Sequence, residues 1–213
     1  MSKEKVIETA RGELGYTESP PGSNETKYGK AYAWDGIPWC AVFLWWCFRE
    51  AGESAAFYGG AKTASCGALL RWYEARGQTV PPRELREGDI VILNFSGTKD
   101  TEHCGLVAGC TPKGTIITIE GNTVLGAGAG AQDNGGAVAM KTRYLSQVVG
   151  VCRPQYTPDP QKPDYAGHWA EDDIRWCIER GLMRGYEDGS FRPDQPVTRG
   201  ELATVLRRIK VQE

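Results

Sequence analysis

Two side chains of this sequence could together carry out nucleophilic chemistry, the thiol of Cys40 and the imidazole of His103. Cys40 begins the run CAVFLWWCFREAG, which is apolar on every side and ends at Gly52, as is typical of a buried helix. The sulfur is therefore expected at a helix N-terminus, where backbone N–H groups and the macrodipole stabilise a thiolate. The same N–H groups could stabilise a tetrahedral oxyanion.

The identity of the nucleophile depends on its partner, because Cys40 taken alone could equally be a small apolar residue at a helix start. His103 begins the predicted strand HCGLVAGC after a polar loop, and alternation places Cys104 on the opposite face of that strand. It is the only histidine before residue 154, and therefore the only imidazole available to Cys40 in that part of the chain. Cys47 is expected two turns deeper in the helix and inert, which leaves Cys40 as the only thiol at an exposed helix start.

An acceptor for the second ring nitrogen of His103 is predicted in the segment GTIITIEGNT. Alternation along this strand places Glu120 and Asn122 on one face. Glu120 could fix the tautomer of His103 and stabilise the imidazolium, and Asn122 could do the same or bind substrate. Glu120 could also be a solvated carboxylate at a strand end. Cysteine, histidine and an acidic or amide group in this order follow the logic of papain-type catalysis.

Composition excludes several other functions. The chain has 213 residues and a net charge of −2, which gives no indication of a nucleic-acid partner. No stretch approaches the roughly 18 apolar residues of a membrane span, so no membrane partner is expected. Seven cysteines without a CxxC motif and only two histidines argue against a disulfide framework and a zinc site of the usual kind. We expect no metal and no cofactor.

The elements that must position these residues divide the chain into two parts. Helices are predicted from Ser2 to about Leu14, from Cys40 and through CGALLRWYEARG, and the later segments GDIVILNF, HCGLVAGC, GTIITIEGN and VVGVC are predicted strands. Helices followed by strands indicate an α+β fold with the helices on one side of an antiparallel sheet. Segment 154–163 contains four prolines and is predicted to be an extended linker between a catalytic domain, 1–153, and a small module, 164–213.

The small module is predicted to contain two helices. Helical spacing of apolar residues from Trp169 to Leu182 predicts one amphipathic helix that ends at Gly185. Thr198 and Glu201 form a capping box ahead of a second helix. This local role already accounts for the two capping residues.

The motifs PWCAVFLWWCFREAG, GDIVIL, EHCGLVAG and IEGNT, in this order, resemble those of the CHAP family of cysteine, histidine-dependent amidohydrolases and peptidases. The resemblance covers roughly residues 4–153. It implies papain-like cleavage of amide bonds in peptidoglycan, with Cys40, His103, Glu120 and Asn122 at the catalytic positions.

Two further expectations accompany this resemblance. Some CHAP domains bind calcium in the loop before the cysteine. Here Asp35 is the only carboxylate of that loop, which argues against a calcium site because calcium takes 6–8 oxygen ligands. Tyr28 and Trp39, which precede the nucleophile, are candidate substrate-binding residues.

The motifs GHWA and GYEDGSFRPDQPVTRGE resemble an S-layer homology module, with Gly200 where that family usually has alanine. The resemblance implies noncovalent binding to a secondary cell-wall polysaccharide, often one that carries acidic ketal groups. Trp169 would stack on the sugar and Arg199 would pair with the acid group. Such modules usually come in threes, so a single copy is expected to form a homotrimer or to act as a weak tether.

A hydrolase joined to a wall anchor resembles a phage-type endolysin, and this is the predicted function. No signal peptide is predicted at the N-terminus, so we expect a protein made in the cytoplasm that acts at the bacterial cell wall after release. The alternatives are a host autolysin for wall remodelling and a wall-binding protein whose hydrolase fold is inactive. N-acetylmuramoyl-L-alanine amidase and peptidoglycan endopeptidase activities both stay open.

Overall fold

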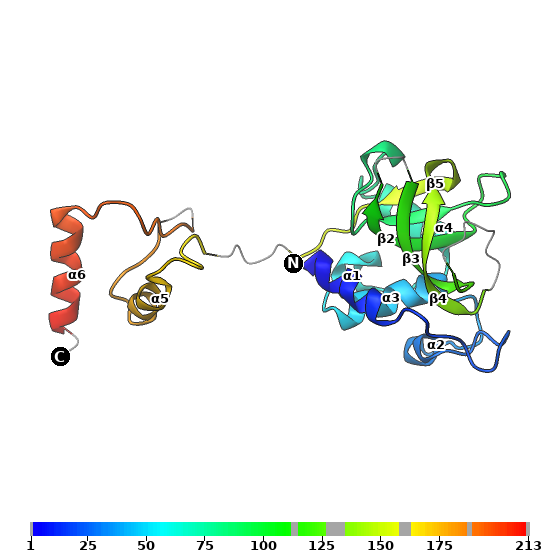
Figure 1. Ribbon diagram of the computed structural model, residues 1–213, viewed down its shortest axis with the longest axis horizontal. Helices are drawn as coiled ribbons and strands as arrows, with labels where there is room; N and C mark the ends of the chain where they lie inside the picture. The colour runs from blue at the N-terminus through cyan, green and yellow to red at the C-terminus, as the bar shows by residue number, and fades with distance from the viewer. Residues whose placement is uncertain (1, 112–114, 127–134, 158–162, 187–188, 212–213) are drawn as a thin grey trace. The chain divides into compact units, whose positions relative to one another are not determined.

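The computed structural model describes residues 2–111, 115–126, 135–157, 163–186 and 189–211. The chain divides into two compact units, Met1–Pro158 and Asp159–Glu213, each with its own secondary structure (Figure 1). No helix among the described residues is both long and apolar enough to cross a membrane.

The first unit is an α+β domain whose helices come before its strands. Its helices are α1 (Ser2–Gly12), α2 (Lys27–Tyr32), α3 (Cys40–Glu50) and α4 (Cys66–Glu74). Its strands are β1 (Ile90–Leu93), β2 (His103–Cys110), β3 (Thr115–Thr123), β4 (Ala137–Tyr144) and β5 (Val148–Cys152). Short 3-10 turns lie at Ser54–Ala56, Tyr58–Gly60, Pro82–Glu84 and Leu145–Gln147.

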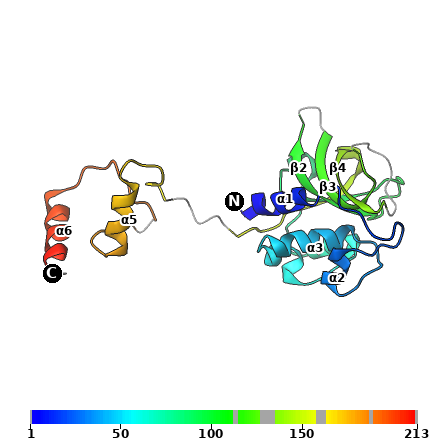
Figure 2. The same ribbon diagram turned by 60° about the horizontal axis from the view of Figure 1, so that its bottom comes forward.

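The five strands form one sheet in the order β4-β3-β2-β1-β5, and every neighbouring pair is antiparallel. Helix α3 packs on β2 and β3, and α1 and α2 pack on α3, so these helices lie on one side of the sheet (Figure 2). The main core lies between these layers. A smaller apolar cluster, built around Val91, Leu93 and Val107, occupies the other face of the sheet.

The central helix follows directly from its sequence. Eight of the eleven residues of α3 are buried, because the helix is enclosed by α1, α2 and two strands. Gly121 of β3 permits this close approach: a Cβ atom at that position would lie 2.5 Å from Cβ of Phe43. The helix and strand that bear the candidate site are thus pressed together where a side chain on β3 would separate them.

The predicted helix and sheet arrangement is confirmed, with the short helix α2 and one strand added. β4 was not predicted, because its sequence AVAMKTRY places Lys141 and Arg143 at positions that are buried in the sheet. A strand with charged residues on an inward face does not show the apolar alternation that marks a strand in sequence.

The chain after β5 stays attached to the first unit. Arg153 pairs with Asp89, with Nη2 2.8 Å from Oδ2, and Tyr156 donates a 2.6 Å hydrogen bond to the carbonyl of Gly88. The backbone N–H of Thr157 donates to Oε2 of Glu53 at 2.9 Å. The linker predicted over 154–163 is therefore too long at its start, because its first residues are held by hydrogen bonds to the domain.

The second unit contains α5 (Glu171–Glu179) and α6 (Arg199–Val211). The predicted capping box is present: the N–H of Glu201 donates to Oγ1 of Thr198 at 3.2 Å, and the N–H of Thr198 donates to Oε2 of Glu201 at 2.7 Å. The helix predicted between Trp169 and Gly185 is shorter than expected. It begins at Glu171, just after a turn in which the ring of His168 accepts the N–H of Ala170, and it ends at Glu179.

Candidate active site

Cys40 is the first residue of α3, as the sequence predicts. Its N-cap residue, Trp39, supplies no side-chain acceptor for the first N–H groups of the helix. These N–H groups and the helix dipole therefore stabilise negative charge on the sulfur of Cys40 and on an anionic group beside it. The side chain of Cys40 is only 6% exposed, so the nucleophile lies at the edge of the core and not on an open surface.

Tyr28 and Trp39 were expected to bind substrate, and the structure corrects this. Both side chains have no exposed surface, and their rings stack 5.5 Å apart. The hydroxyl of Tyr28 donates to Glu13 at 2.5 Å, and the indole N–H of Trp39 donates to Glu18 at 3.4 Å. These aromatic rings fill the core beneath the start of α3 and fix the position of Cys40, so they cannot stack on a sugar.

His103 opens β2 and is held by Glu120 of β3, with Nε2 3.0 Å from Oε2. Both side chains are buried. Because Nε2 is engaged by the carboxylate, Nδ1 is the nitrogen left to exchange a proton with a thiol. Gly105 makes this pair possible, since a Cβ there would lie 2.8 Å from Cγ of Glu120.

A further member of the site, Arg143 of β4, was missed by sequence reasoning. Its Nε donates to Oε1 of Glu120 at 2.8 Å, and its Nη2 donates to Oε2 at 2.5 Å. Thr118 adds a hydroxyl donor to Oε1 at 2.5 Å. The arginine is fully buried, as is the carboxylate, so a bidentate ion pair holds the acceptor of His103 in place. Its segment lacks the apolar alternation of a strand, so no pattern in the sequence pointed to this arginine.

Asn122 lies at an irregularity in β3. The strand register shifts between Glu120 and Thr123, and Asn122 has φ 55°, in the left-handed region. The regular alternation on which the shared face was predicted is interrupted there, and the shared face of Glu120 and Asn122 stays a prediction. The side-chain oxygen of Asn122 is buried without a hydrogen-bond partner among the described residues.

The electrostatics of the site favour a thiolate beside an imidazolium. The thiols of Cys104 and Cys66 and then hydrogen bonding with His103 hold the pKa of Cys40 well below its usual range. Burial lowers the pKa of His103, but hydrogen bonds with Cys40 and Glu120 outweigh it and raise that pKa to about 10. Burial likewise opposes ionisation of Glu120, yet Arg143 and His103 lower its pKa to about 2.

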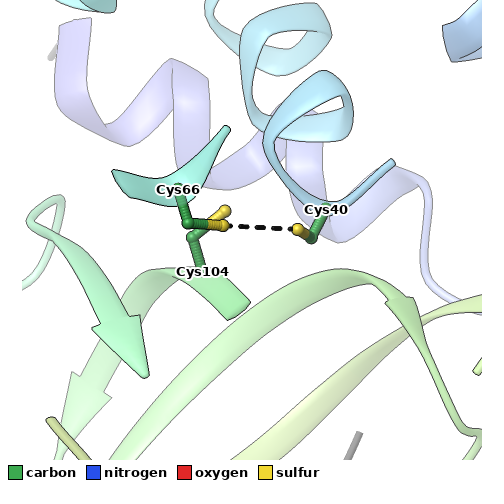
Figure 3. A group of neighbouring side chains, drawn as sticks. All are labelled: Cys40, Cys66 and Cys104. Atoms are coloured by element: carbon green, nitrogen blue, oxygen red, sulfur yellow. Dashed lines mark hydrogen bonds between the residues drawn. The ribbon is translucent and has the colours of Figure 1, made fainter. Parts of the chain in front are cut away.

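Two other thiols surround the nucleophile. Cys66 is the first residue of α4, and its sulfur lies 3.6 Å from that of Cys40 (Figure 3). Cys104 was predicted on the face of β2 opposite His103. Its side chain belongs to the main core, on the helix side of β2, and Cys40 belongs to the same core. The three sulfurs all lie within 4.8 Å of one another. Cys40 is therefore not the only thiol at a helix start, contrary to the sequence-based expectation.

Asp35, the one carboxylate of the loop considered for calcium, has a local structural role. Its Oδ1 accepts the backbone N–H of Thr26 at 2.9 Å, and Thr26 is the N-cap of α2. A carboxylate engaged in shaping the start of a helix has less capacity left for a cation.

The residues expected to bind the wall polysaccharide lie on the surface of the second unit. Trp169 is 88% exposed and Arg199 is also exposed. A cavity of about 500 Å³ in this unit is lined by other residues, including Tyr186, Arg192 and Arg208. Neither Trp169 nor Arg199 lines it, so their role as polysaccharide ligands stays a prediction.

A thiol at a helix N-terminus beside a histidine on an antiparallel sheet, with a carboxylate behind the histidine, is the arrangement of residues that papain-like cysteine hydrolases use. Comparison with protein families agrees with this class. The model described as "CHAP domain" matches residues 27–122, and the model described as "S-layer homology domain" matches residues 163–203. The chain thus contains a CHAP domain of papain-like fold followed by an S-layer homology domain.

Individual relatives match shorter parts of the chain. Cell surface glycoprotein 1 of Acetivibrio thermocellus is 48% identical over 50 residues, which cover 22% of this chain and 2% of that protein. S-layer protein sap of Bacillus anthracis is 35% identical over 73 residues, covering 34% of this chain and 9% of that protein. The chain thus spans a small part of the length of both curated relatives. The crystal structure of Ly7917 aligns with a TM-score of 0.43 and 16% identity, covering 72% of this chain and 63% of that one.

Proposed function

We propose that this protein is a peptidoglycan hydrolase that cleaves an amide bond through Cys40 and is held at the wall by its S-layer homology domain. The observation that carries the proposal is the buried series Cys40, His103 and Glu120, in which His103 hydrogen-bonds with both the thiol and the carboxylate. A wall-binding protein with an inactive hydrolase fold would have no need to keep a protonated histidine beside a thiol with a lowered pKa.

In the first step of the proposed mechanism, the thiolate of Cys40 attacks the carbonyl carbon of the substrate amide. The N–H groups at the start of α3 are the donors for the resulting oxyanion. Nδ1 of His103 then gives its proton to the departing amine, the C–N bond breaks, and an acyl-thioester on Cys40 remains.

In the second step, neutral His103 takes a proton from water, and the hydroxide formed attacks the thioester. The carboxylic acid product leaves, and the sulfur of Cys40 departs as a thiolate beside the imidazolium. Glu120 stays ionised throughout, since its ion pair with Arg143 stabilises the carboxylate form. Its role is to hold the ring and stabilise the positive charge on it.

For the second unit, we propose adsorption to a secondary cell-wall polysaccharide, with self-association as a source of avidity. Leu202, Leu206 and Ile209 recur along one face of α6 and are 48%, 54% and 43% exposed. A single domain of this size buries little of its own apolar surface, so contact with further copies would cover this face. A homotrimer would also place several weak polysaccharide sites on one particle.

We also propose an endolysin role, in which the enzyme reaches the wall after release from the cell that makes it. The combination of a lytic domain with a wall-binding domain supports this role. Its test is to produce the protein in a bacterium whose wall it cleaves. Lysis that begins only when the membrane is permeabilised supports the proposal, and lysis without permeabilisation contradicts it.

The experiment that tests the hydrolase function is mass spectrometry of fragments released from purified walls by the full chain, with Cys40→Ala as the blank. New N-terminal L-alanine on free stem peptides would identify an amidase, and cut peptide bridges with intact lactyl amides would identify an endopeptidase. Walls that release nothing beyond the blank would reduce the protein to a wall-binding module.

A further inference from the structure

The three thiols around the nucleophile form a compact cluster that the hydrolytic mechanism does not require. The sulfurs of Cys40, Cys66 and Cys104 lie within 4.8 Å of one another and point toward a common centre (Figure 3). They come from the start of α3, the start of α4 and the second position of β2. Hydrolysis uses one of these sulfurs, so the other two call for a separate explanation.

We propose that Cys40, Cys66 and Cys104 form a binding site for a soft divalent metal ion of the zinc class, and that the bound ion blocks the nucleophile. Thiolate sulfur is the ligand that such ions prefer. In tetrahedral zinc–thiolate sites with bonds of about 2.3 Å, neighbouring sulfurs are about 3.8 Å apart. The Cys40 and Cys66 sulfurs are already 3.6 Å apart.

The third ligand needs little rearrangement. The sulfur of Cys104 lies within 4.8 Å of both others, so a shift of about 1 Å brings it to the spacing of a tetrahedral site. Such a shift is within the range of a side-chain adjustment on a strand whose neighbours stay in place. Three protein ligands leave the fourth position to a water molecule or another small ligand, as in zinc sites with three protein ligands.

The surroundings of the cluster suit a thiolate–metal centre. Cys40 and Cys66 are each the first residue of a helix, so the positive ends of two helix dipoles lie at these residues and stabilise negative charge on the sulfurs. All three cysteines are free thiols with buried side chains. Binding is coordination alone: the thiol protons pass to solvent, and no electron is transferred.

The metal-binding test does not depend on the proposed hydrolysis. The full chain is stripped with a chelator, kept reduced with a phosphine, and titrated with Co²⁺ and Zn²⁺. A thiolate-to-cobalt charge-transfer absorption and one bound ion per chain are expected for the wild type. Cys66→Ala and Cys104→Ala should bind at least about 100-fold more weakly, because even the loss of an outer-shell partner costs 10–100-fold.

Cys47→Ala is the matched control, since Cys47 lies on α3 with its side chain buried and outside the cluster. It should bind the ion as the wild type does. Equal binding by Cys47→Ala, Cys66→Ala and Cys104→Ala would overturn the proposal. Circular dichroism of each variant shows whether it is folded. If Cys66→Ala or Cys104→Ala fails to fold, Cys40→Ser removes the third ligand and tests the ligand set again.

The blocking of the nucleophile is tested separately, and this arm alone rests on the proposed function. Alkylation of Cys40 by iodoacetamide, followed by peptide mass spectrometry, should be suppressed by Zn²⁺ and restored by a chelator. Wall hydrolysis should follow the same course, measured against the metal-free rate of each variant. Protection that is reversed by a thiol reductant and not by a chelator would indicate a disulfide with Cys66 and would contradict a metal site.

Discussion

Arg143 holds Glu120 through two parallel hydrogen bonds inside the sheet, Nε to Oε1 at 2.8 Å and Nη2 to Oε2 at 2.5 Å, with both side chains fully buried. This ion pair keeps the carboxylate that hydrogen-bonds with His103 ionised. A carboxylate that cannot take up a proton near neutral pH keeps His103 positive, and the positive ring keeps a thiolate nearby. Arg143 therefore acts on the nucleophile only through Glu120 and His103, in addition to the thiols of Cys104 and Cys66 that lower the pKa of Cys40 directly.

Replacement of Arg143 by methionine should destabilise the first unit by about 3–5 kcal/mol, because it leaves the Glu120 carboxylate buried and unpaired. Urea unfolding followed by circular dichroism measures the loss. The double variant Arg143→Met, Glu120→Gln should recover part of that stability. Arg49→Ala, which removes an exposed pair with Glu50, is the control and should change stability by less than about 1 kcal/mol. Equal effects of Arg143→Met and Arg49→Ala would contradict a buried ion pair.

Cys40→Ala should abolish wall hydrolysis and leave the fold intact, because it removes the nucleophile and only a small part of the core. Turbidity clearing of wall suspensions and circular dichroism measure the two effects. Cys110→Ala, at an exposed cysteine on the same sheet, is the control and should stay active. His103→Ala should be about as damaging as Cys40→Ala, and the double variant no worse, because the two residues act as one unit. Clearing by Cys40→Ala above a trace would remove this assignment.

The pH profile of kcat/KM on soluble wall fragments should be a bell with a broad top. Activity rises as Cys40 ionises, below the ordinary thiol range because its pKa is lowered, and falls near pH 10, where His103 loses its proton. Glu120→Gln should move the alkaline limb down by about one pH unit or more, since the carboxylate raises the histidine's pKa. The double variant with Arg143→Met should give the same shift without the unpaired arginine. An unchanged profile in both would assign the orienting role to Asn122.

Asn122→Gly should lower kcat/KM by roughly tenfold to a hundredfold without moving either limb of the pH profile. The buried and unpaired oxygen of Asn122 is an acceptor available to a substrate N–H, and the loss of one such bond costs about 1–3 kcal/mol. Glycine accepts the positive φ of this position, so the backbone is preserved. A shifted alkaline limb would indicate that Asn122 acts on His103 instead of on substrate.

Removal of the chain after Thr157 should leave hydrolysis of soluble fragments unchanged and weaken adsorption to walls. The first unit has its own core, and the truncated chain retains residues 153–157, which are hydrogen-bonded to that unit. We therefore expect the first unit to fold without the second. Pelleting with purified walls measures adsorption, and light scattering measures mass. Leu206→Lys in the full chain should reduce self-association and adsorption together. A full-length monomer that binds walls tightly would exclude avidity as the mechanism, and equal adsorption by the truncated chain would exclude anchoring.

Much of the site could be predicted because local sequence determines it. An apolar helix that starts at Cys40, a strand that starts at His103 and a carboxylate at Glu120 are features of short segments, and local hydrophobic patterning places them correctly. Trp39 shows the limit of this reasoning. An aromatic residue beside a nucleophile can face substrate or core, and only packing against Tyr28 decides between them.

What could not be predicted depends on contacts between distant segments. Arg143 looks like a solvated residue of an irregular segment until β4 pairs with β3 and brings it to Glu120. The cluster of Cys40, Cys66 and Cys104 has no CxxC spacing, because each thiol comes from a different element. The bulge at Asn122 breaks a period that the sequence alone shows as regular.

The hydrogen bonds of Tyr156 and Thr157 have a practical consequence for the design of chimeras. They make the position after Thr157 the natural junction for a chimera. The residues before this junction are hydrogen-bonded to the first unit, and the S-layer homology match begins only at residue 163. Chimeras that exchange the S-layer homology domain should retain residues through 157. Grafts joined at 152 or earlier would strip the Asp89 carboxylate of its arginine and expose the ring face of Phe48 that Tyr156 covers.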